Sequence, residues 1–133
     1  MKVKRFGVSL EEDILTELDH FVDQRKFPNR SQAIRYLISN YLVEDKIDAN
    51  QFVAGSIVLV YDHHKRDLQN KSTSIQHDFH DAILSVQHVH IDHHNCLETI
   101  AVMGKAVRLQ ELADKLIAIK GVKHGRLVIT TTS

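Results

Sequence analysis

The segment HVHIDHHNC, residues 88–96, joins the end of one apolar stretch, residues 84–91, to the start of another, residues 96–103. The four polar residues between the two stretches, 92–95, are typical of a turn between paired strands. The sequence therefore predicts an antiparallel hairpin here. The same nine residues contain four histidines and the only cysteine of the chain, which makes the hairpin a candidate metal site.

Apolar periodicity on both sides of the hairpin predicts the rest of a domain over residues 52–133. A valine-rich run, FVAGSIVLVY, indicates a buried strand, and two segments with apolar residues at helical spacing indicate helices. Besides the hairpin, the expected elements are strands at 52–61 and 127–131 and helices at 65–83 and 105–120. The order βαββαβ is that of a ferredoxin-like domain.

A smaller unit is predicted over residues 1–47. Phe6, Val8 and Leu10 alternate with polar residues, which predicts a short strand, and two amphipathic helices follow it. One strand and two helices bury little apolar surface, and the strand has nothing to pair with in its own chain. We therefore expect this strand to pair with the same strand of a second chain in an intertwined dimer. The fold class is α+β.

Local signals suggest where the elements of this unit begin and end. A capping box over residues 9–12 is expected to start the first helix, and Ser31 is expected to cap the second. A charged stretch, residues 44–51, is expected to link the two domains.

Composition limits the kinds of protein this chain can be. No run of 18 or more apolar residues is present, so no membrane helix is expected, and residues 1–13 lack the apolar segment of a secretory signal. A single cysteine cannot form a disulfide within the chain, and either a thiolate ligand or a buried thiol suits a reducing compartment. We expect a cytoplasmic protein.

Strand geometry selects a metal-binding group among the ten histidines. Residues two apart on a strand share a face, so His88 and His90 point the same way and Cys96 lies beside them on the next strand. His77, on a predicted helix, is a candidate fourth ligand from its own chain or another. Histidines 63, 64, 93 and 94 are expected to be solvated.

The identity of the ion stays open on these residues. Tetrahedral geometry would indicate zinc, and square-planar geometry would indicate nickel(II) or copper(II). The alternative is that these histidines are ordinary polar residues on the surface of a sheet.

Charge is sorted along the first unit although the net charge is zero. Residues 1–9 and 24–36 hold basic side chains and no acidic ones. A two-stranded ribbon fits the DNA major groove, and a helix N-terminus offers free N–H groups to a phosphate. The expected DNA contacts are Arg5, Gly7 and Ser9 on the ribbon, Arg30 and Ser31 at the second helix, and Lys65 and Arg66 as phosphate contacts. The alternative is a dimerisation unit with a solvated basic surface.

The sequence resembles the nickel-responsive transcriptional regulators, the NikR-type ribbon-helix-helix proteins, over nearly its whole length. The stretches that carry the resemblance are RFGVSLEED, NRSQAIR, HKRDL, QHDFHD and HVHIDHHNCLE. The resemblance implies a ribbon-helix-helix domain followed by an ACT-type domain, assembled as a homotetramer that is a dimer of dimers. It also implies nickel-dependent binding to double-stranded operator DNA, most often repressing nickel-uptake genes.

The same resemblance implies roles for individual residues. Square-planar Ni²⁺ would be held by His88, His90 and Cys96 of one chain and His77 of another, with Glu98 supporting the ligands. The chain departs from the family in two places. Gly7 stands where well-known members carry a polar side chain on the ribbon, so the operator sequence is not carried over. Gln32 and Tyr36 stand where some members place acidic residues around an inter-domain cation, so that cation site is not carried over.

Three rival functions remain on sequence grounds. A metal oxygenase also uses a His-x-His strand, but the chain lacks a carboxylate at the short spacing expected after the second histidine. A four-ligand site would also leave no open position for a substrate. We therefore expect no enzymatic activity. The other rivals are a metal store or chaperone without a DNA role, and a sensor of another ion such as copper or cobalt.

Overall fold

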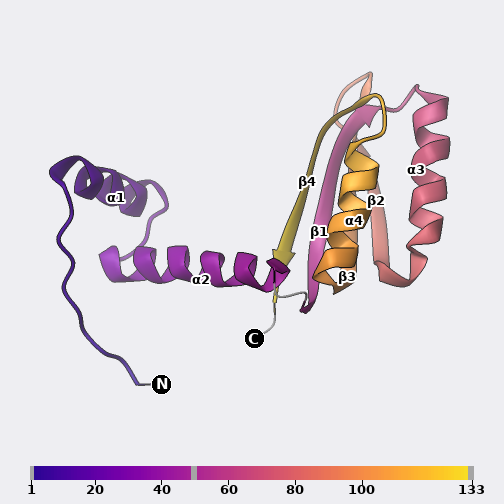
Figure 1. Ribbon diagram of the computed structural model, residues 1–133. Coiled ribbons are helices and arrows are strands. Elements are labelled where there is room, and N and C mark those ends of the chain that lie inside the picture. The colour runs from indigo at the N-terminus through magenta and orange to yellow at the C-terminus, as the bar shows by residue number, and fades with distance from the viewer. Residues whose placement is uncertain (1, 49–50, 132–133) are drawn as a thin grey trace. The chain divides into compact units, whose positions relative to one another are not determined.

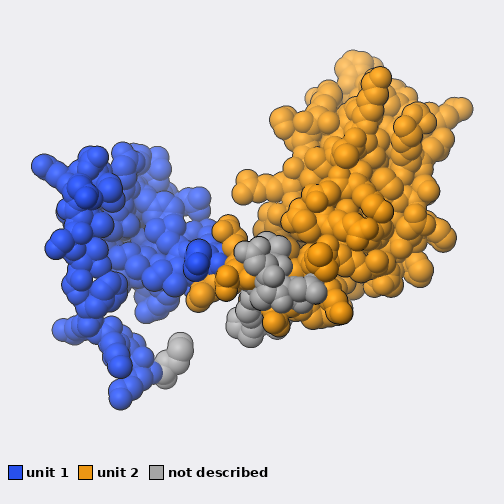
Figure 2. Space-filling model, viewed as in Figure 1, with its two compact units in different colours: residues 1–41 blue, residues 42–133 orange. Residues whose placement is uncertain are grey.

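The computed structural model describes residues 2–48 and 51–131, and the chain divides into two compact units, residues 1–41 and 42–133 (Figures 1 and 2). The first unit contains α1 (Glu12–Gln24) and most of α2 (Arg30–Asp48). The second contains β1 (Phe52–Asp62), α3 (Arg66–Asp78), a 3₁₀ turn (His80–Ala82), β2 (Ile83–His90), β3 (Asn95–Lys105), α4 (Ala106–Ile117) and β4 (Val122–Thr130).

The second unit has the predicted βαββαβ order. Its four strands form an antiparallel sheet in the order β2-β3-β1-β4. Both helices cover one face of this sheet (Figure 1), and the core lies between them and the inward residues of β1 and β3. The largest fully buried side chains include Ile57, Leu59, Ile100, Leu109, Leu112 and Leu116. The α+β class and the predicted hairpin are confirmed.

The opposite face of the sheet is open in a single chain. Val89, Met103 and Val128 lie on that face with about half of their surface exposed, at 43%, 43% and 54%. Single exposed apolar residues are common on proteins, and exposed apolar residues on one face of a sheet make that face a candidate contact surface for another protein.

The first unit is built around an aromatic cluster between its helices. The rings of Phe21, Phe27 and Tyr36 lie 5.4–6.2 Å apart. Residues 2–11 precede α1 without forming a strand, and Phe6 remains 74% exposed. The strand expected here needs a partner edge, which the single chain does not provide.

Several predicted element ends are wrong. Glu11 occupies the N-cap position of α1, without a side-chain cap, so the capping box at residues 9–12 does not form. Asn29 rather than Ser31 caps α2, because its side-chain oxygen accepts a hydrogen bond from the Gln32 N–H at 2.9 Å. A cap must precede the first turn, and Ser31 already lies inside it.

Three longer segments also differ from expectation. α2 continues to Asp48, so the stretch predicted to link the domains is helical over residues 44–48. α3 ends at Asp78 rather than at residue 83, since Phe79 turns into the core and the chain enters the sheet through the 3₁₀ turn. β4 begins at Val122, five residues before the predicted start at 127, because its first half carries polar residues that hide the strand pattern.

We predict that Gly55→Ala destabilises the second unit. Gly55 lies on β1, where an added Cβ would overlap the backbone oxygen of Val128 on the paired strand β4. Paired backbone atoms move less easily than the end of a flexible side chain. We therefore expect a loss of about 1–3 kcal/mol in the free energy of unfolding, measured by urea denaturation.

Gly104→Ala is the matched control for this substitution. Its Cβ would lie at ordinary contact distances of 3.6 and 3.9 Å from Leu109 and Ala82. Equal stability of the two variants would contradict the prediction.

Candidate metal centre

Strand register brings the predicted ligands of the hairpin to one end of the sheet. His90 pairs with Cys96, and His88 pairs with Glu98, two residues further along β3. Cys96 Sγ lies 3.9 Å from His88 Nδ1. Cys96 is buried whereas the His88 side chain is 56% exposed, so the pair combines a buried soft sulfur donor with an imidazole donor that reaches solvent.

His90 completes this group only in part. Its ring stacks on the His63 ring, with the ring centres 4.3 Å apart and the planes inclined by 10°. In the described part of the chain, the donor atoms of His88, His90 and Cys96 do not all lie within 4.8 Å of one another. Side chains of this group would therefore have to move before all three could bind one ion.

A buried carboxylate stands behind His88. Glu98 is 1% exposed, and its two oxygens accept hydrogen bonds from the Tyr61 hydroxyl at 2.6 Å and the Gln76 amide at 2.7 Å. His88 Nδ1 lies 3.3 Å from both the Tyr61 hydroxyl and a Glu98 oxygen. Burial, together with the hydrogen bond to Glu98, raises the pKa of Tyr61, so its hydroxyl stays protonated and donates. This network fixes the position of the carboxylate beside the His88 ring.

Neither Tyr61 nor Gln76 was singled out from the sequence. Tyr61 follows Ile57 and Leu59 on the inward face of β1 and pairs with Cys96, so strand parity combined with the sheet order would have found it. Gln76 precedes His77 on α3, and only the packing of that helix places its amide on Glu98. Together with Ser72 and His88 they line a pocket of about 240 Å³.

His77 lies apart from the hairpin donors of its own chain. It is exposed near the end of α3 and lines a different surface pocket with Thr73, Gln76, His80 and Ile83. Its ring stacks against His80, with ring centres 5.9 Å apart. The single chain therefore does not bring the fourth predicted ligand to the other three.

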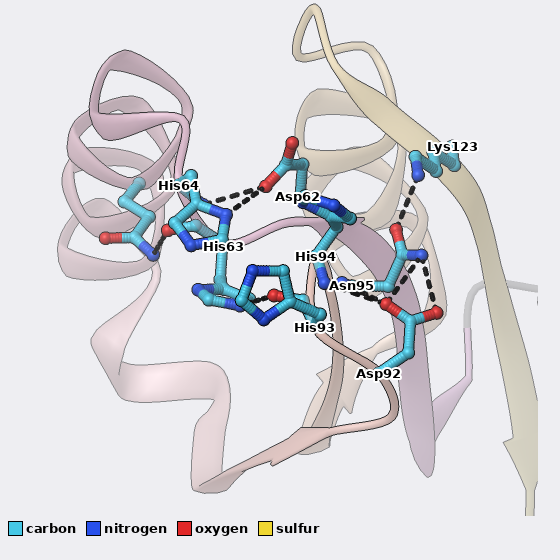
Figure 3. Close-up of polar contacts among 9 residues, drawn as sticks. Asp62, His63, His64, Asp92, His93, His94, Asn95 and Lys123 are labelled. Carbon is cyan, nitrogen blue, oxygen red and sulfur yellow. Dashed lines mark hydrogen bonds and ion pairs between the residues drawn. The ribbon is translucent and has the colours of Figure 1, made fainter.

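A second group of donors lies at the end of β1, where solvated histidines were predicted. Asp62, His64 and His94 place their ligand atoms within 4.8 Å of one another (Figure 3). Hydrogen bonds from the backbone and ring of His64 hold the pKa of Asp62 below its usual value, with a smaller contribution from the charge of His94. Sequence spacing could not reveal this group, because Asp62 and His64 lie at the end of β1 and His94 lies about thirty residues later in the β2–β3 turn.

The predicted DNA contacts fall on exposed parts of the chain. Arg5, Gly7 and Ser9 lie in the extended segment before α1, and Ser31 lies in the first turn of α2. Lys65 and Arg66 begin α3 and are exposed. Arg30 differs from the others, since its guanidinium makes two hydrogen bonds to Asp19, at 2.7 and 2.9 Å.

Comparisons with known proteins agree with this arrangement. The sequence model of the NikR C-terminal nickel-binding domain matches residues 54–130, and that of the ribbon-helix-helix proteins of the copG family matches residues 4–45. A "Putative nickel-responsive regulator" of Desulfovibrio desulfuricans is 52% identical and aligns over 96% of this chain and 93% of its own length. The chain belongs to the nickel-responsive regulator family. Its two domains are thus a DNA-binding domain and a nickel-binding domain.

More distant relatives and solved structures extend the comparison. A protein of the same name from the archaeon Thermococcus onnurineus is 45% identical over 99% of this chain and 96% of its own length. Among solved structures, the ACT domain from GTP pyrophosphokinase of Chlorobium tepidum has a TM-score of 0.50 at 20% identity, covering 59% of this chain and all of that domain. An uncharacterised protein from Thermotoga maritima has a TM-score of 0.55 at 15% identity, covering 61% of this chain and all of its own. These likenesses confirm the ACT-like fold of the second unit.

We predict that Glu98→Gln lowers stability, because an amide replaces one of two acceptor oxygens. The new NH₂ group would face either the Gln76 amide, which is another donor, or the Tyr61 hydroxyl, which would have to turn and accept instead of donating. Leaving one buried donor unsatisfied costs about 1–3 kcal/mol, measurable by urea denaturation.

Glu111→Gln makes the same chemical change at the surface and serves as the control. Glu111 pairs with Lys115 at 3.5 Å and is about half exposed, so its loss should change stability by less than about 1 kcal/mol. A Glu98→Gln variant as stable as the Glu111→Gln variant would show that the network contributes little.

Proposed function

We propose that this protein binds operator DNA when loaded with nickel and represses genes of nickel uptake. The observation that carries the proposal is the meeting of Cys96 Sγ and His88 Nδ1 at 3.9 Å, on a hairpin whose inner side is fixed by Glu98. The same chain has a basic N-terminal unit of the ribbon-helix-helix type, so nickel binding in one domain can control DNA binding by the other.

The ligands proposed for Ni²⁺ are His88, His90 and Cys96 of one chain and His77 of another. A thiolate with three imidazoles suits a late transition ion, and His77 is exposed where a second chain can reach it. Glu98 would orient His88 through Nδ1, 3.3 Å away, and leave Nε2 for the ion, since a metal-bound histidine commonly donates its other ring N–H to a carboxylate. When bound, nickel supplies a rigid link among these four side chains.

We further propose a homotetramer that is a dimer of dimers, located in the cytoplasm. Two features of the single chain support contacts with other copies of it. Residues 5–10 need a partner strand, and the open sheet face with Val89, Met103 and Val128 needs an apolar cover. No described helix is both long and apolar enough to cross a bilayer.

The proposed DNA contacts divide into two classes. Arg5, Gly7 and Ser9 would face base edges in the major groove, with Arg5 as the side chain able to make a bidentate contact. Arg30, Ser31, Lys65 and Arg66 would contact phosphates, which adds affinity without sequence preference. Arg30 would have to share its guanidinium between Asp19 and a phosphate.

A storage protein is the second candidate function, and an enzyme is a third. Four protein ligands on a nickel ion leave no position for substrate in a square-planar site, which argues against catalysis. The experiment that separates these functions is a gel shift with promoter fragments of nickel-uptake genes, with and without Ni²⁺. Retardation of a specific fragment only with Ni²⁺ supports a regulator, whereas nickel binding without any DNA effect supports a store.

Cys96→Ser provides the metal-specific version of this experiment. We expect the variant to lose the sulfur-to-nickel absorption band and nickel-dependent retardation together. A band of unchanged intensity in the variant would exclude Cys96 as a ligand. His93→Ala should retain both signals, because His93 lies in the turn beyond the proposed ligands.

We predict that Arg5→Ala weakens operator binding and leaves nickel binding intact. Loss of a bidentate arginine–guanine contact costs about 1–3 kcal/mol of discrimination, measurable by competition between operator and non-specific DNA. Lys65→Ala should instead weaken both DNAs alike and reduce the salt dependence of binding. An Arg5→Ala variant with full operator preference would remove this residue from base recognition.

Mixing two defective chains tests whether the site is shared between chains. His77→Ala and Cys96→Ser chains each lack one proposed ligand, so neither alone should bind nickel tightly. After subunit exchange, a shared site can combine an intact His77 from one chain with an intact hairpin from the other, and part of the tight binding should return. No recovery after verified exchange would place all ligands in one chain.

A further inference from the structure

The two loops that meet at the end of β1 carry a donor group separate from the proposed nickel ligands. Asp62 ends β1, His64 follows it, and His94 lies in the β2–β3 turn (Figure 3). Their ligand atoms lie within 4.8 Å of one another. No member of this group belongs to the set His77, His88, His90 and Cys96.

Part of the group already has the spacing of ligands on one ion. Asp62 Oδ1 and His64 Nδ1 are 3.1 Å apart. Two donors bound to one ion at typical zinc bond lengths lie about 3.0–3.4 Å from each other. The contact between Asp62 Oδ1 and His64 Nδ1 is a hydrogen bond, so an ion that bound both atoms would take the place of its proton. The ligand nitrogen of His94 lies within 4.8 Å of both atoms, so its side chain would move inward to bind the same ion.

The loop that supplies His94 is held in place by its own hydrogen bonds. Asp92 Oδ1 accepts from the backbone N–H groups of His94 and Asn95, each at 2.8 Å, and these bonds with those from the Asn95 side chain lower the pKa of Asp92 to about 2. Lys123 of β4 donates to the Asn95 side chain (Figure 3). The His94 carbonyl in turn accepts from the His63 N–H at 3.1 Å. The two loops are thus tied together by their backbones before any ion binds.

The donor types select the class of ion. Two imidazoles and one carboxylate suit Zn²⁺, Co²⁺ or Ni²⁺ better than Mg²⁺ or Ca²⁺, which prefer oxygen ligands alone. The His64 side chain is 53% exposed, so an ion can enter directly from solvent and keep water on its remaining positions. Because the group has no thiolate and is open, it should bind more weakly than a set containing Cys96.

We propose that Asp62, His64 and His94 form a second site for a borderline divalent cation, with Zn²⁺ as the best-suited probe. The site is next to the proposed nickel ligand Cys96 in the sheet. Asp62 pairs with Asn95, and the neighbouring pair is Tyr61 with Cys96. The His63 ring, stacked on His90, lies between the two groups. An ion here would fasten the end of β1 to the turn that leads into Cys96.

Zinc binding to the full-length protein tests the site. The protein is first loaded with nickel and freed of excess, then dialysed against Zn²⁺, and both metals are measured per chain by mass spectrometry. We expect about one additional zinc per chain with nickel retained, and the same zinc in a Cys96→Ser background without nickel. Asp62→Asn and His64→Gln should each lose most of this zinc in both backgrounds.

His20→Gln is the matched control, since it removes an exposed histidine of the first unit. It should keep the additional zinc. Circular dichroism of each variant excludes unfolding as the cause of lost binding, and His94→Gln provides a further variant in the other loop. The proposal is overturned if nickel-loaded protein takes up no further zinc, if zinc merely replaces nickel and is absent from the Cys96→Ser protein, or if the zinc persists in Asp62→Asn and His64→Gln. None of these results depends on whether the protein binds DNA.

Discussion

The buried carboxylate of Glu98 is the interaction on which the metal-binding end of this fold depends. A carboxyl group at 1% exposure is costly to bury unless both oxygens are satisfied. Tyr61 satisfies one from β1 and Gln76 satisfies the other from α3, so β1, β3 and α3 are joined at a single point. Because apolar residues in place of such a group would often be stabilising, burial alone gives Glu98 no advantage, and the orientation of His88 is its proposed role.

This arrangement explains why the chemistry lies at one end of the sheet. The inward stripes of β1 and β3 are aliphatic along most of their length and become polar only at Tyr61, Cys96 and Glu98. The aliphatic part provides the stability of the unit, and the polar part is small enough to be fully hydrogen-bonded. His88 and His90 lie on β2, one of the two edge strands of the sheet, so their rings reach solvent while their backbones remain paired.

Much of this could be predicted from the sequence, and the failures have physical causes. Period-two alternation placed His88, His90 and Cys96 correctly on neighbouring strands, because a hairpin fixes its own register through a short turn. The helix ends at Ser31 and residue 83 were misplaced because capping and termination depend on single hydrogen bonds and on the burial of Phe79, which periodicity does not report. The group Asp62, His64 and His94 was missed for another reason. Two loops distant in sequence meet only through the pairing of β1 with β3.

Neither unit is complete as a single chain, and this incompleteness suggests how metal and DNA binding are coupled. The ribbon segment lacks a partner strand, His77 lies away from the hairpin donors, and the sheet has an uncovered apolar face. In the proposed tetramer, other copies of the chain supply what each feature lacks, so the assembly rather than the chain is the unit that nickel would influence. A ligand shifts a conformational equilibrium only as far as its affinities for the two states differ. A site shared between chains would be complete only in the arrangement that brings His77 of one chain to the hairpin of another. Its affinity for nickel would therefore differ between the arrangements. Helix α3 carries His77 and the Gln76 that holds Glu98, and Lys65 and Arg66 lie at its start, so one helix joins a proposed nickel ligand to the proposed phosphate contacts.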